Sequence, residues 1–275
     1  MKNKIQKRIK SETYLNKKIY IHNEMKFLKK ADLKYVSFFS MISTILIWEF
    51  CCRMQLMSPL FLPAPTAIGH EAIDMILSGE LVQNISASLY RIGIGYIIGS
   101  LCGIIVGLIL GFSKWMNAIF SPLIYMLYPI PKIALLPLIV LWLGIGELPK
   151  FTIIALGIFF PVFINTFSGV KNIDSNLIKA AVLFKTSRKR MLFEVMLPGA
   201  LPSIFTGLKI ASGTSLLLLI AAEMIAAQKG IGTLILHYGN LMLTTKLMVG
   251  VITLSLLGLS FHHFLNWLTK RLLWW

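Results

Sequence analysis

The stretch SASLYRIGIGYIIGSLCGIIVGLILG, residues 86–111, contains one charged side chain, that of Arg91. A helix needs about 20 mostly apolar residues to cross the ~30 Å hydrocarbon core of a bilayer. Five glycines recur in this stretch at a four-residue spacing, which puts them on one helix face. They are Gly95, Gly99, Gly103, Gly107 and Gly111. The stretch therefore predicts a transmembrane helix with a groove for a neighbouring backbone. The groove serves either ordinary tight packing or a rocking movement of one helix on the other.

Long apolar blocks run through the whole chain. Of its 275 residues, 56% are hydrophobic and 14% are charged, and these charges are too few to cover a water-soluble domain of this length. We expect an all-α membrane protein with about six transmembrane helices. The expected spans are residues 36–56, 86–111, 119–143, 150–170, 204–227 and 247–268. Four prolines interrupt the third, so we expect a short helix and then a kinked segment there.

The basic residues flank the apolar blocks. Eleven of the 27 Lys and Arg precede the first span, and seven more lie between Lys171 and Lys209. This distribution follows the positive-inside rule and argues against nucleic-acid binding, despite the net charge of +16. It assigns 21 of the 27 to the cytoplasmic side. The sequence thus predicts a multi-pass protein of the bacterial inner membrane, with both termini in the cytoplasm.

Two parts of the chain are expected. Residues 1–35 form a basic cytoplasmic segment that does not resemble a cleavable signal; it either lies along the anionic lipid surface or is a disordered tail. Residues 36–275 form the transmembrane domain. Its outward connection, residues 57–85, contains no Lys or Arg. A short helix capped by Thr66 is expected there.

A long cytoplasmic loop, about residues 171–203, separates the fourth and fifth spans. Asp174 or Ser175 is expected to cap a first helix, and Ser187 a second one that Pro198 terminates soon after Met196. Six apolar residues would stabilise this projection: Ala180, Ala181, Phe184, Met191, Leu192 and Val195. Ordered helices with an apolar face need a surface to pack on, which is either the protein's own span ends or a soluble partner.

The loop sequence KAAVLFKTSRKRMLFEVMLPGALPSIFTGLKIA, residues 179–211, resembles the signature loop of ABC-importer permeases. Ala180 and Ala181 match the family's alanine pair, and Leu197 and Pro198 match its closing pair. The segments LPAPTAI, LWLGIGELPKF, FPVFINTFSGVKNID and AAEMIAAQKGIGTLI are also similar to the family. The resemblance runs from about Trp48 to the C-terminus. It is to the sulfonate, nitrate and taurine branch, and it implies the type I importer architecture.

The resemblance also implies a mechanism and partners. The loop would be a coupling helix that docks on a separate ATP-binding subunit, present in two copies, beside a permease homodimer and an external solute-binding protein. The solute would be a small organic anion or a vitamin precursor. The coupling residues would be Lys179, Ala180, Ala181, Phe184, Lys185, Ser187, Arg188, Leu197 and Pro198.

Two of these residues depart from the family pattern. Lys179 replaces a glutamate, and Lys185 replaces a glycine whose positive φ eases the turn. A lysine at that φ costs about 1 kcal/mol. The basic run Arg188–Arg190 is either an anchor for lipid headgroups or part of the partner surface.

The chain carries no pattern typical of catalysis. It lacks the phosphate-binding motif G-x-x-x-x-G-K-[ST], so if ATP drives the process, a separate subunit must bind it. We expect no catalytic, cofactor or metal residues, and hence a transport subunit and no enzyme. Ionisable residues in or near the spans are candidates for the pathway or for structural pairs: Glu49, Arg91, Lys132 and Glu223.

Two other classes of protein are considered. An ion-coupled secondary transporter would need several intramembrane carboxylates and inverted repeats, whereas the sequence offers one central carboxylate and no evident repeat. A membrane-embedded enzyme would need a catalytic constellation, and none is evident.

Overall fold

The computed structural model describes residues 33–56 and 58–273. The chain divides into two units, one ending at Pro59 and one running from Leu60 to the C-terminus. In the first unit the described part is mainly helix α2 (Leu33–Arg53). Nearly all of the expected basic segment, residues 1–35, lies outside the described residues. Glu49, one of the ionisable residues expected in or near the spans, falls within the apolar helix Tyr35–Arg53. It lies one turn from the end of α2, where it accepts a hydrogen bond from Arg53 Nε at 2.7 Å.

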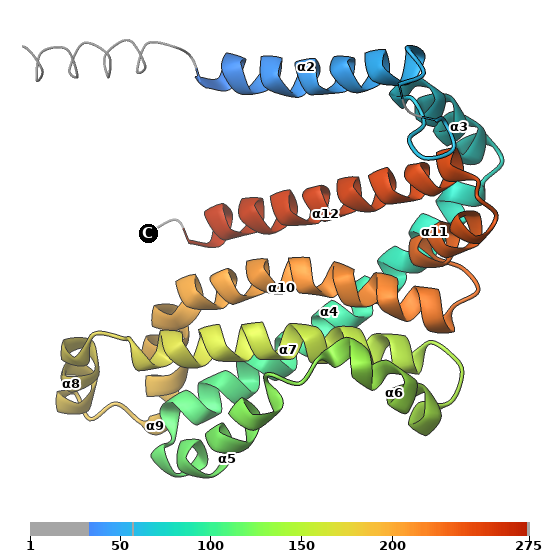
Figure 1. The fold of residues 1–275 in the computed structure, drawn as a ribbon. Coiled ribbons are helices and arrows are strands. Elements are labelled where there is room, and N and C mark those ends of the chain that lie inside the picture. The colour runs from blue at the N-terminus through green and yellow to red at the C-terminus, as the bar shows by residue number, and fades with distance from the viewer. Residues whose placement is uncertain (1–32, 57, 274–275) are drawn as a thin grey trace, which may run out of the picture. The chain divides into compact units, whose positions relative to one another are not determined.

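The second unit is built from helices throughout its described length (Figure 1). They are α3 (Pro65–Leu77), α4 (Glu80–Phe112), α5 (Lys114–Leu127), the 3₁₀ turn η1 (Lys132–Leu135), α6 (Leu136–Leu143), α7 (Leu148–Lys171), α8 (Ser175–Leu183), α9 (Arg188–Arg190), the π-helical turn η2 (Met191–Met196), α10 (Leu197–Ala226), α11 (Ile231–Asn240) and α12 (Thr244–Leu272).

Five helices of the described chain are long and apolar enough to cross a membrane, and the number is six if a bent pair is counted as one span. The five are Tyr35–Arg53, Glu80–Phe112, Leu148–Lys171, Arg188–Ala226 and Thr244–Leu272. The prediction of an all-α membrane protein with about six spans is confirmed. The second span begins earlier than expected, at Glu80. Lys209 lies within α10, as the expected span 204–227 implies, although the count of 21 cytoplasmic charges also included it.

The bent pair, which is the candidate for the sixth span, consists of α5 and of η1 with α6. The two segments, Lys114–Leu127 and Lys132–Leu143, meet at 87°. Pro129 and Pro131 lie in the connection, and proline can neither donate to the helix ladder nor fit against the preceding carbonyl. The predicted short helix followed by a kinked segment is therefore what forms.

Helix α7 is the centre of the second unit, because it packs most extensively against both α4 and α10. A hydrophobic core of mostly aliphatic side chains joins the three, with Ile154, Ile158 and Leu219 almost wholly buried. The glycine face of α4 lies directly on α7. A β-carbon on Gly99 would lie 2.5 Å from the Ala155 carbonyl oxygen, so only glycine permits this approach.

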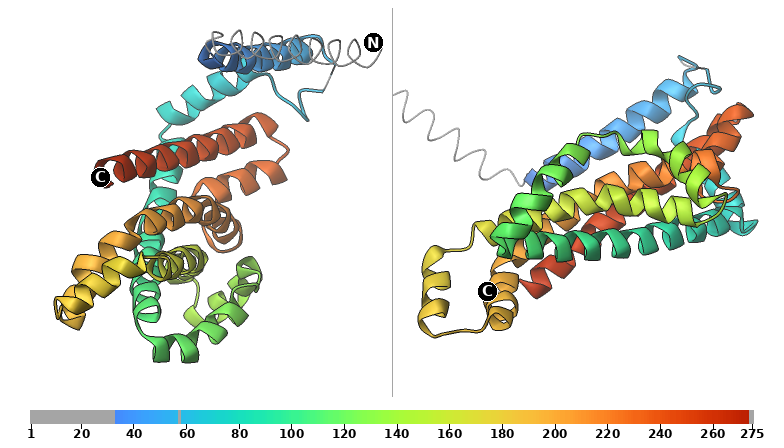
Figure 2. Two further views of the ribbon diagram at one scale, coloured as in Figure 1. Left: turned by 90° about the vertical axis from the view of Figure 1, so that its left-hand side faces the viewer. Right: turned by 90° about the horizontal axis from the view of Figure 1, so that it is seen from below.

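The connections alternate between two ends of this unit. Helix α8 projects beyond α7 and α10 at one end, as the views in Figures 1 and 2 agree. The end of α4 is packed there too, since Leu108 shares a cluster with Val170 and Ala181. The C-terminal end of α12 points the same way, whereas α3, α11 and the α6–α7 connection lie at the opposite end (Figure 1).

The short helix expected in the connection 57–85 is α3, but Thr66 does not cap it. Ala64 is the N-cap, and Pro65 occupies the first turn. Proline suits that position because its fixed φ is already helical and the N–H that it lacks has no acceptor there.

Candidate functional site

The projecting loop is the first candidate site. Of the two caps that the sequence allowed, Asp174 is the one that caps α8, accepting a hydrogen bond from the Asn176 N–H at 2.8 Å. At the other end of α8, Lys185 has a φ of +52°. The Lys185 N–H donates to the Val182 carbonyl at 2.9 Å and the Thr186 N–H to the Ala181 carbonyl at 3.0 Å. This is the glycine-type helix ending. The chain keeps the turn geometry despite the lysine, and the cost of about 1 kcal/mol applies.

The second helix of the loop differs from the prediction. Ser187 caps it, accepting from the Arg190 N–H, but the helix does not end at Pro198. It continues through η2 into α10 as one span, Arg188–Ala226. Pro198 falls in the first turn of α10, directly after the π-helical turn. Proline has no N–H to donate to a carbonyl of the preceding turn. The π-helical turn pairs residues five apart instead of four, and this shift in the hydrogen bonds accommodates the proline.

The loop's apolar residues divide between two surroundings. Ala181 is buried within the chain's own cluster of Met191, Met196 and Ala200, and Ala180 is half-buried. Phe184 is 85% exposed, so the expectation that it stabilises the projection is wrong. Three neighbouring apolar side chains on α8 are exposed with it: Leu177, Val182 and Leu183. Lys179 and Arg188 are also exposed, whereas Leu197 and Pro198 are half-buried.

A buried charge cluster lies at the opposite end of the unit. Arg91 of α4 donates from Nε and Nη2 to the two carboxylate oxygens of Glu147, at 2.7 and 2.9 Å. Its Nη1 donates to Glu223 Oε1 of α10 at 2.8 Å and to the Lys229 carbonyl. Lys150 of α7 donates to Glu147 at 2.8 Å. The cluster ties together the ends of three spans, and its charges neutralise one another.

Glu223 is wholly buried, and two further donors reach its carboxylate. Ser88 Oγ donates to its Oε1 at 2.7 Å, and the Gly232 N–H at the start of α11 donates to its Oε2 at 2.8 Å. Gly230 has a φ of +136°, and a β-carbon there would fall on the Glu223 carboxylate. This contact explains why the segment AAEMIAAQKGIGTLI needs both its glutamate and its first glycine.

Glu147 is the member of the cluster that precedes a span. Its side chain is 42% exposed. The hydrogen bond from Arg91 lowers the pKa of the Glu147 carboxyl to about 2, against the opposing effect of partial burial and with further help from Lys150. The carboxylate therefore stays ionised across the physiological range.

Sequence reasoning singled out Arg91 and Glu223 but missed Glu147, Lys150 and Ser88. A signal was available for Glu147 and Lys150, because they lie three residues apart at a helix start, inside the quoted segment LWLGIGELPKF. No local signal connects them with Arg91, which lies 56 residues earlier than Glu147.

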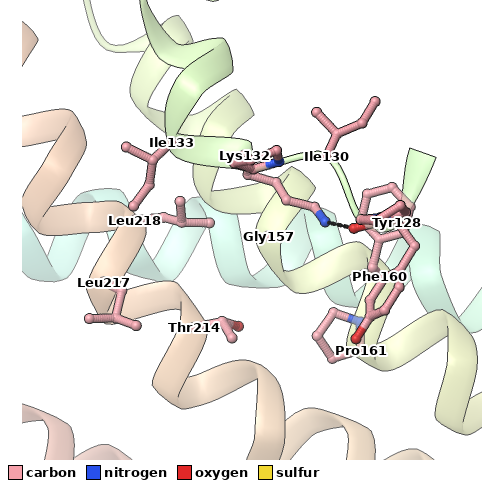
Figure 3. A pocket seen from close by; sticks show the side chains of 12 residues that line it. Tyr128, Ile130, Lys132, Ile133, Gly157, Phe160, Pro161, Thr214, Leu217 and Leu218 are labelled. Carbon is pink, nitrogen blue, oxygen red and sulfur yellow. Dashed lines mark hydrogen bonds between the residues drawn. The ribbon is translucent and has the colours of Figure 1, made fainter. Parts of the chain in front are cut away.

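A pocket opens where the bent span meets α7 and α10 (Figure 3). Its volume is about 460 Å³. Lys132 extends along it, with Nζ 4.4 Å from the ring centre of Phe160 and 5.0 Å from that of Tyr128. Thr214 and Leu217 of α10 line the other side. None of the residues that line the pocket is an aspartate or a glutamate.

Comparison with known proteins identifies the family. Residues 99–274 match the model of the binding-protein-dependent transport system inner membrane component. A putative aliphatic sulfonates transport permease protein of Bacillus subtilis is 34% identical over 231 residues, which cover 84% of each chain. The taurine transport system permease protein of Escherichia coli is 36% identical over 234 residues, covering 83% of this chain and 85% of that one.

The chain belongs to the family of binding-protein-dependent transport system inner membrane components. The resemblance to the permease branch that includes sulfonate and taurine proteins is confirmed. The fold is similar to that of a chain in an inward-facing methionine ABC transporter, with a TM-score of 0.59 at 20% identity, covering 72% of this chain and 98% of the other. The protein is thus a multi-pass transport component of the inner membrane.

Proposed function

We propose that this chain is the permease subunit of an ATP-driven importer, and that the α8 projection couples it to a separate ATP-binding subunit. The observation that carries the proposal is the exposed apolar end of α8, where Phe184 and Leu183 extend beyond the spans with no contact that buries them. Ala181, by contrast, holds the projection on the chain's own core. A rigid mount with an apolar tip is suited to docking in a partner's groove.

The proposed assembly follows the family pattern. Two copies of this chain would line one pathway, two ATP-binding subunits would engage the two α8 projections, and a solute-binding protein would dock on the external side. Closure of the ATPase pair would pull the projections together and change which side the pathway faces. ATP hydrolysis would belong entirely to the partner chains, so this chain is a transport subunit.

The proposed orientation places the α8 end of the second unit, and both termini, in the cytoplasm. The basic residues of the α8 end support it: Lys171 ends α7, Lys185 lies between α8 and α9, and the run Arg188–Arg190 forms α9. A reporter fused after Lys270 should read cytoplasmic, and one inserted at Gly79 should read external.

The proposed solute is a small organic anion of the sulfonate or taurine type, or a vitamin precursor. The names of the relatives support the first class. The alternative of an ion-coupled transporter gains no support from the described spans, because their two candidate carboxylates have basic partners: Glu223 pairs with Arg91, and Glu49 with Arg53.

The docking proposal is tested by replacing Phe184 with alanine. Truncation of an aromatic anchor at an interface costs about 2 kcal/mol or more, so binding of the ATP-binding subunit should weaken at least about thirtyfold. The melting temperature and membrane abundance should change little, because the Phe184 side chain is 85% exposed. Phe264→Ala, at a half-exposed phenylalanine of α12, is the matched control and should bind the ATPase normally.

Ala181 gives the complementary measurement. Ala181→Glu should reduce abundance and stability, since it buries a charge in the chain's own cluster. ATPase co-purification and membrane abundance are measured in the same preparations. If Phe184→Ala retains full ATPase binding and full uptake, the tip of α8 has no part in coupling.

A further inference from the structure

The pocket around Lys132 has a chemical character that the fold alone does not require. Lys132 lies in the break of the bent span, beside Gly157 and Phe160 in the middle of α7 and Thr214 in the middle of α10. A charged side chain at that depth is costly unless it has a partner or a function. Arg91 at the end of the bundle has two carboxylates; no carboxylate lines the Lys132 pocket.

Part of the hydrogen-bonding capacity of Lys132 is explained by the break itself. In a continuous helix the Tyr128 carbonyl would accept from the residue 132 N–H, but the prolines interrupt that ladder. The Lys132 ammonium donates to the Tyr128 carbonyl instead. An ammonium has three N–H donors, so up to two more are available to a ligand.

The surroundings of the ammonium favour an anion with a short apolar body. The faces of Phe160 and Tyr128 stabilise the cation without neutralising its charge. Beyond them the walls are mostly apolar and include Ile133, Leu217 and Leu218 (Figure 3). A cavity of about 460 Å³ accommodates a molecule of a few heavy atoms together with water.

We propose that this pocket is a binding site within the membrane for the anionic group of the transported solute, held by Lys132 against Phe160 and Tyr128. The inference deepens the proposed function and rests on it for the statement that the bound anion is the solute. A single uncompensated cation midway through the span offers an anion a place to leave water without a repulsive carboxylate nearby. Because the site is a single cation with weak aromatic support, the anion can also leave.

The test uses the purified full-length chain in lipid nanodiscs and radiolabelled ethanesulfonate in equilibrium dialysis. The main variant is Lys132→Gln, which keeps an N–H donor for the Tyr128 carbonyl and removes the charge. Loss of a charge-assisted hydrogen bond should weaken ethanesulfonate binding by about tenfold to a hundredfold. Lys132→Arg restores the charge and should bind within a few-fold of the parent.

Two controls separate charge from size and from general damage. Ethyl methyl sulfone, a neutral compound of similar shape, should compete poorly with ethanesulfonate. Lys171→Met removes another lysine whose ammonium lies over a phenylalanine ring, 5.6 Å from the centre of Phe167, but at the exposed end of α7. It should bind ethanesulfonate like the parent. Equal affinity in the parent and Lys132→Gln would overturn the inference, as would no binding by the parent.

The result of the Lys132 binding test does not depend on whether an ATP-binding subunit docks on α8. If the ATP-binding subunit co-purifies with the chain but Lys132→Gln binds ethanesulfonate unchanged, the pocket inference fails and the importer proposal stands. If Lys132 variants behave as expected but no ATP-binding subunit associates, the pocket remains an anion site and the importer proposal fails.

Discussion

Arg91 and Lys132 are both basic residues inside the spans, and they have opposite surroundings. Arg91 is 5% exposed and touches two carboxylates and a carbonyl, so each of its N–H faces has an acceptor. Lys132 is half-buried, touches one carbonyl and two aromatic faces, and lines an open pocket. The difference indicates that a paired intramembrane charge holds helices together, whereas one without a carboxylate is available to a ligand.

The largest expected effect comes from breaking the buried charge cluster around Arg91. Arg91→Met leaves the wholly buried Glu223 without its cation, which costs about 3–5 kcal/mol. The melting temperature in detergent should fall by about 10 °C. Lys132→Gln should change it little, because no buried carboxylate is left behind. The control is Arg190→Met, whose pair with Glu194 is 3.9 Å long with both side chains mostly exposed and is worth about 1 kcal/mol at most.

A second variant sharpens the same comparison. Adding Glu223→Gln to Arg91→Met removes the unpaired charge and should recover part of the lost stability. If the double variant is no more stable than Arg91→Met, the cluster does not stabilise through charge pairing.

The next effect concerns the helix contact that brings the cluster together. Gly99→Ala places a methyl group 2.5 Å from the Ala155 carbonyl oxygen and should cost about 1–3 kcal/mol, because α4 and α7 must separate. Gly93→Ala on the same helix meets nothing within 4 Å and should be neutral or stabilising by up to about 1 kcal/mol. Thermal unfolding of both variants measures the difference. Equal stability would mean that the glycine face is not a tight contact.

A smaller effect is expected at Lys185, which is far from both Arg91 and Lys132 and therefore tests the turn of α8 by itself. Lys185→Gly relieves the positive φ at the end of α8 and should stabilise that turn by about 1 kcal/mol. Hydrogen exchange of the α8 amides should slow while that of α4 stays unchanged. Lys179→Gly, at an exposed helical position of the same loop, should have the opposite sign. Faster exchange in Lys185→Gly would contradict the account of the turn.

The smallest effect is the pH dependence of the stability that Glu147 of the buried charge cluster contributes. The pKa of Glu147 is lowered from 4.5 to about 2, so its contribution to stability is complete above about 4.5 and is lost as the pH falls toward 2. Partial exposure of the carboxylate keeps the amplitude small. Over that window the melting temperature of Glu147→Gln should fall less than that of the parent. Identical profiles would show that Glu147 gains nothing from Arg91.

Local patterns in the sequence predicted the parts of the fold that depend on short-range rules. Apolar run length marked the spans, prolines marked the bend, and Asp174 and Ser187 marked helix starts. The four-residue glycine spacing predicted the close approach that α7 makes. Each of these features is decided within a few helical turns, so a single sequence contains the necessary information.

The features that were missed depend on contacts between distant segments. Nothing near Glu147 in the sequence shows that Arg91 lies beside it, and nothing near Ala181 shows that it faces its own core while Phe184 faces outward. The lack of a carboxylate around Lys132 also depends on which faces of α7 and α10 meet the bent span. The continuous helix through Pro198 was missed because a π-helical turn has no clear sequence signal.

The most direct test of the central claim is uptake by proteoliposomes. The chain is reconstituted with its ATP-binding subunit, the solute-binding protein is supplied outside, and accumulation of radiolabelled taurine and ethanesulfonate is measured with and without ATP inside. The account predicts that accumulation needs ATP and all three proteins. It also predicts that the Phe184→Ala variant does not accumulate the solute. Accumulation by the chain alone, driven by an ion gradient and independent of ATP, would contradict it.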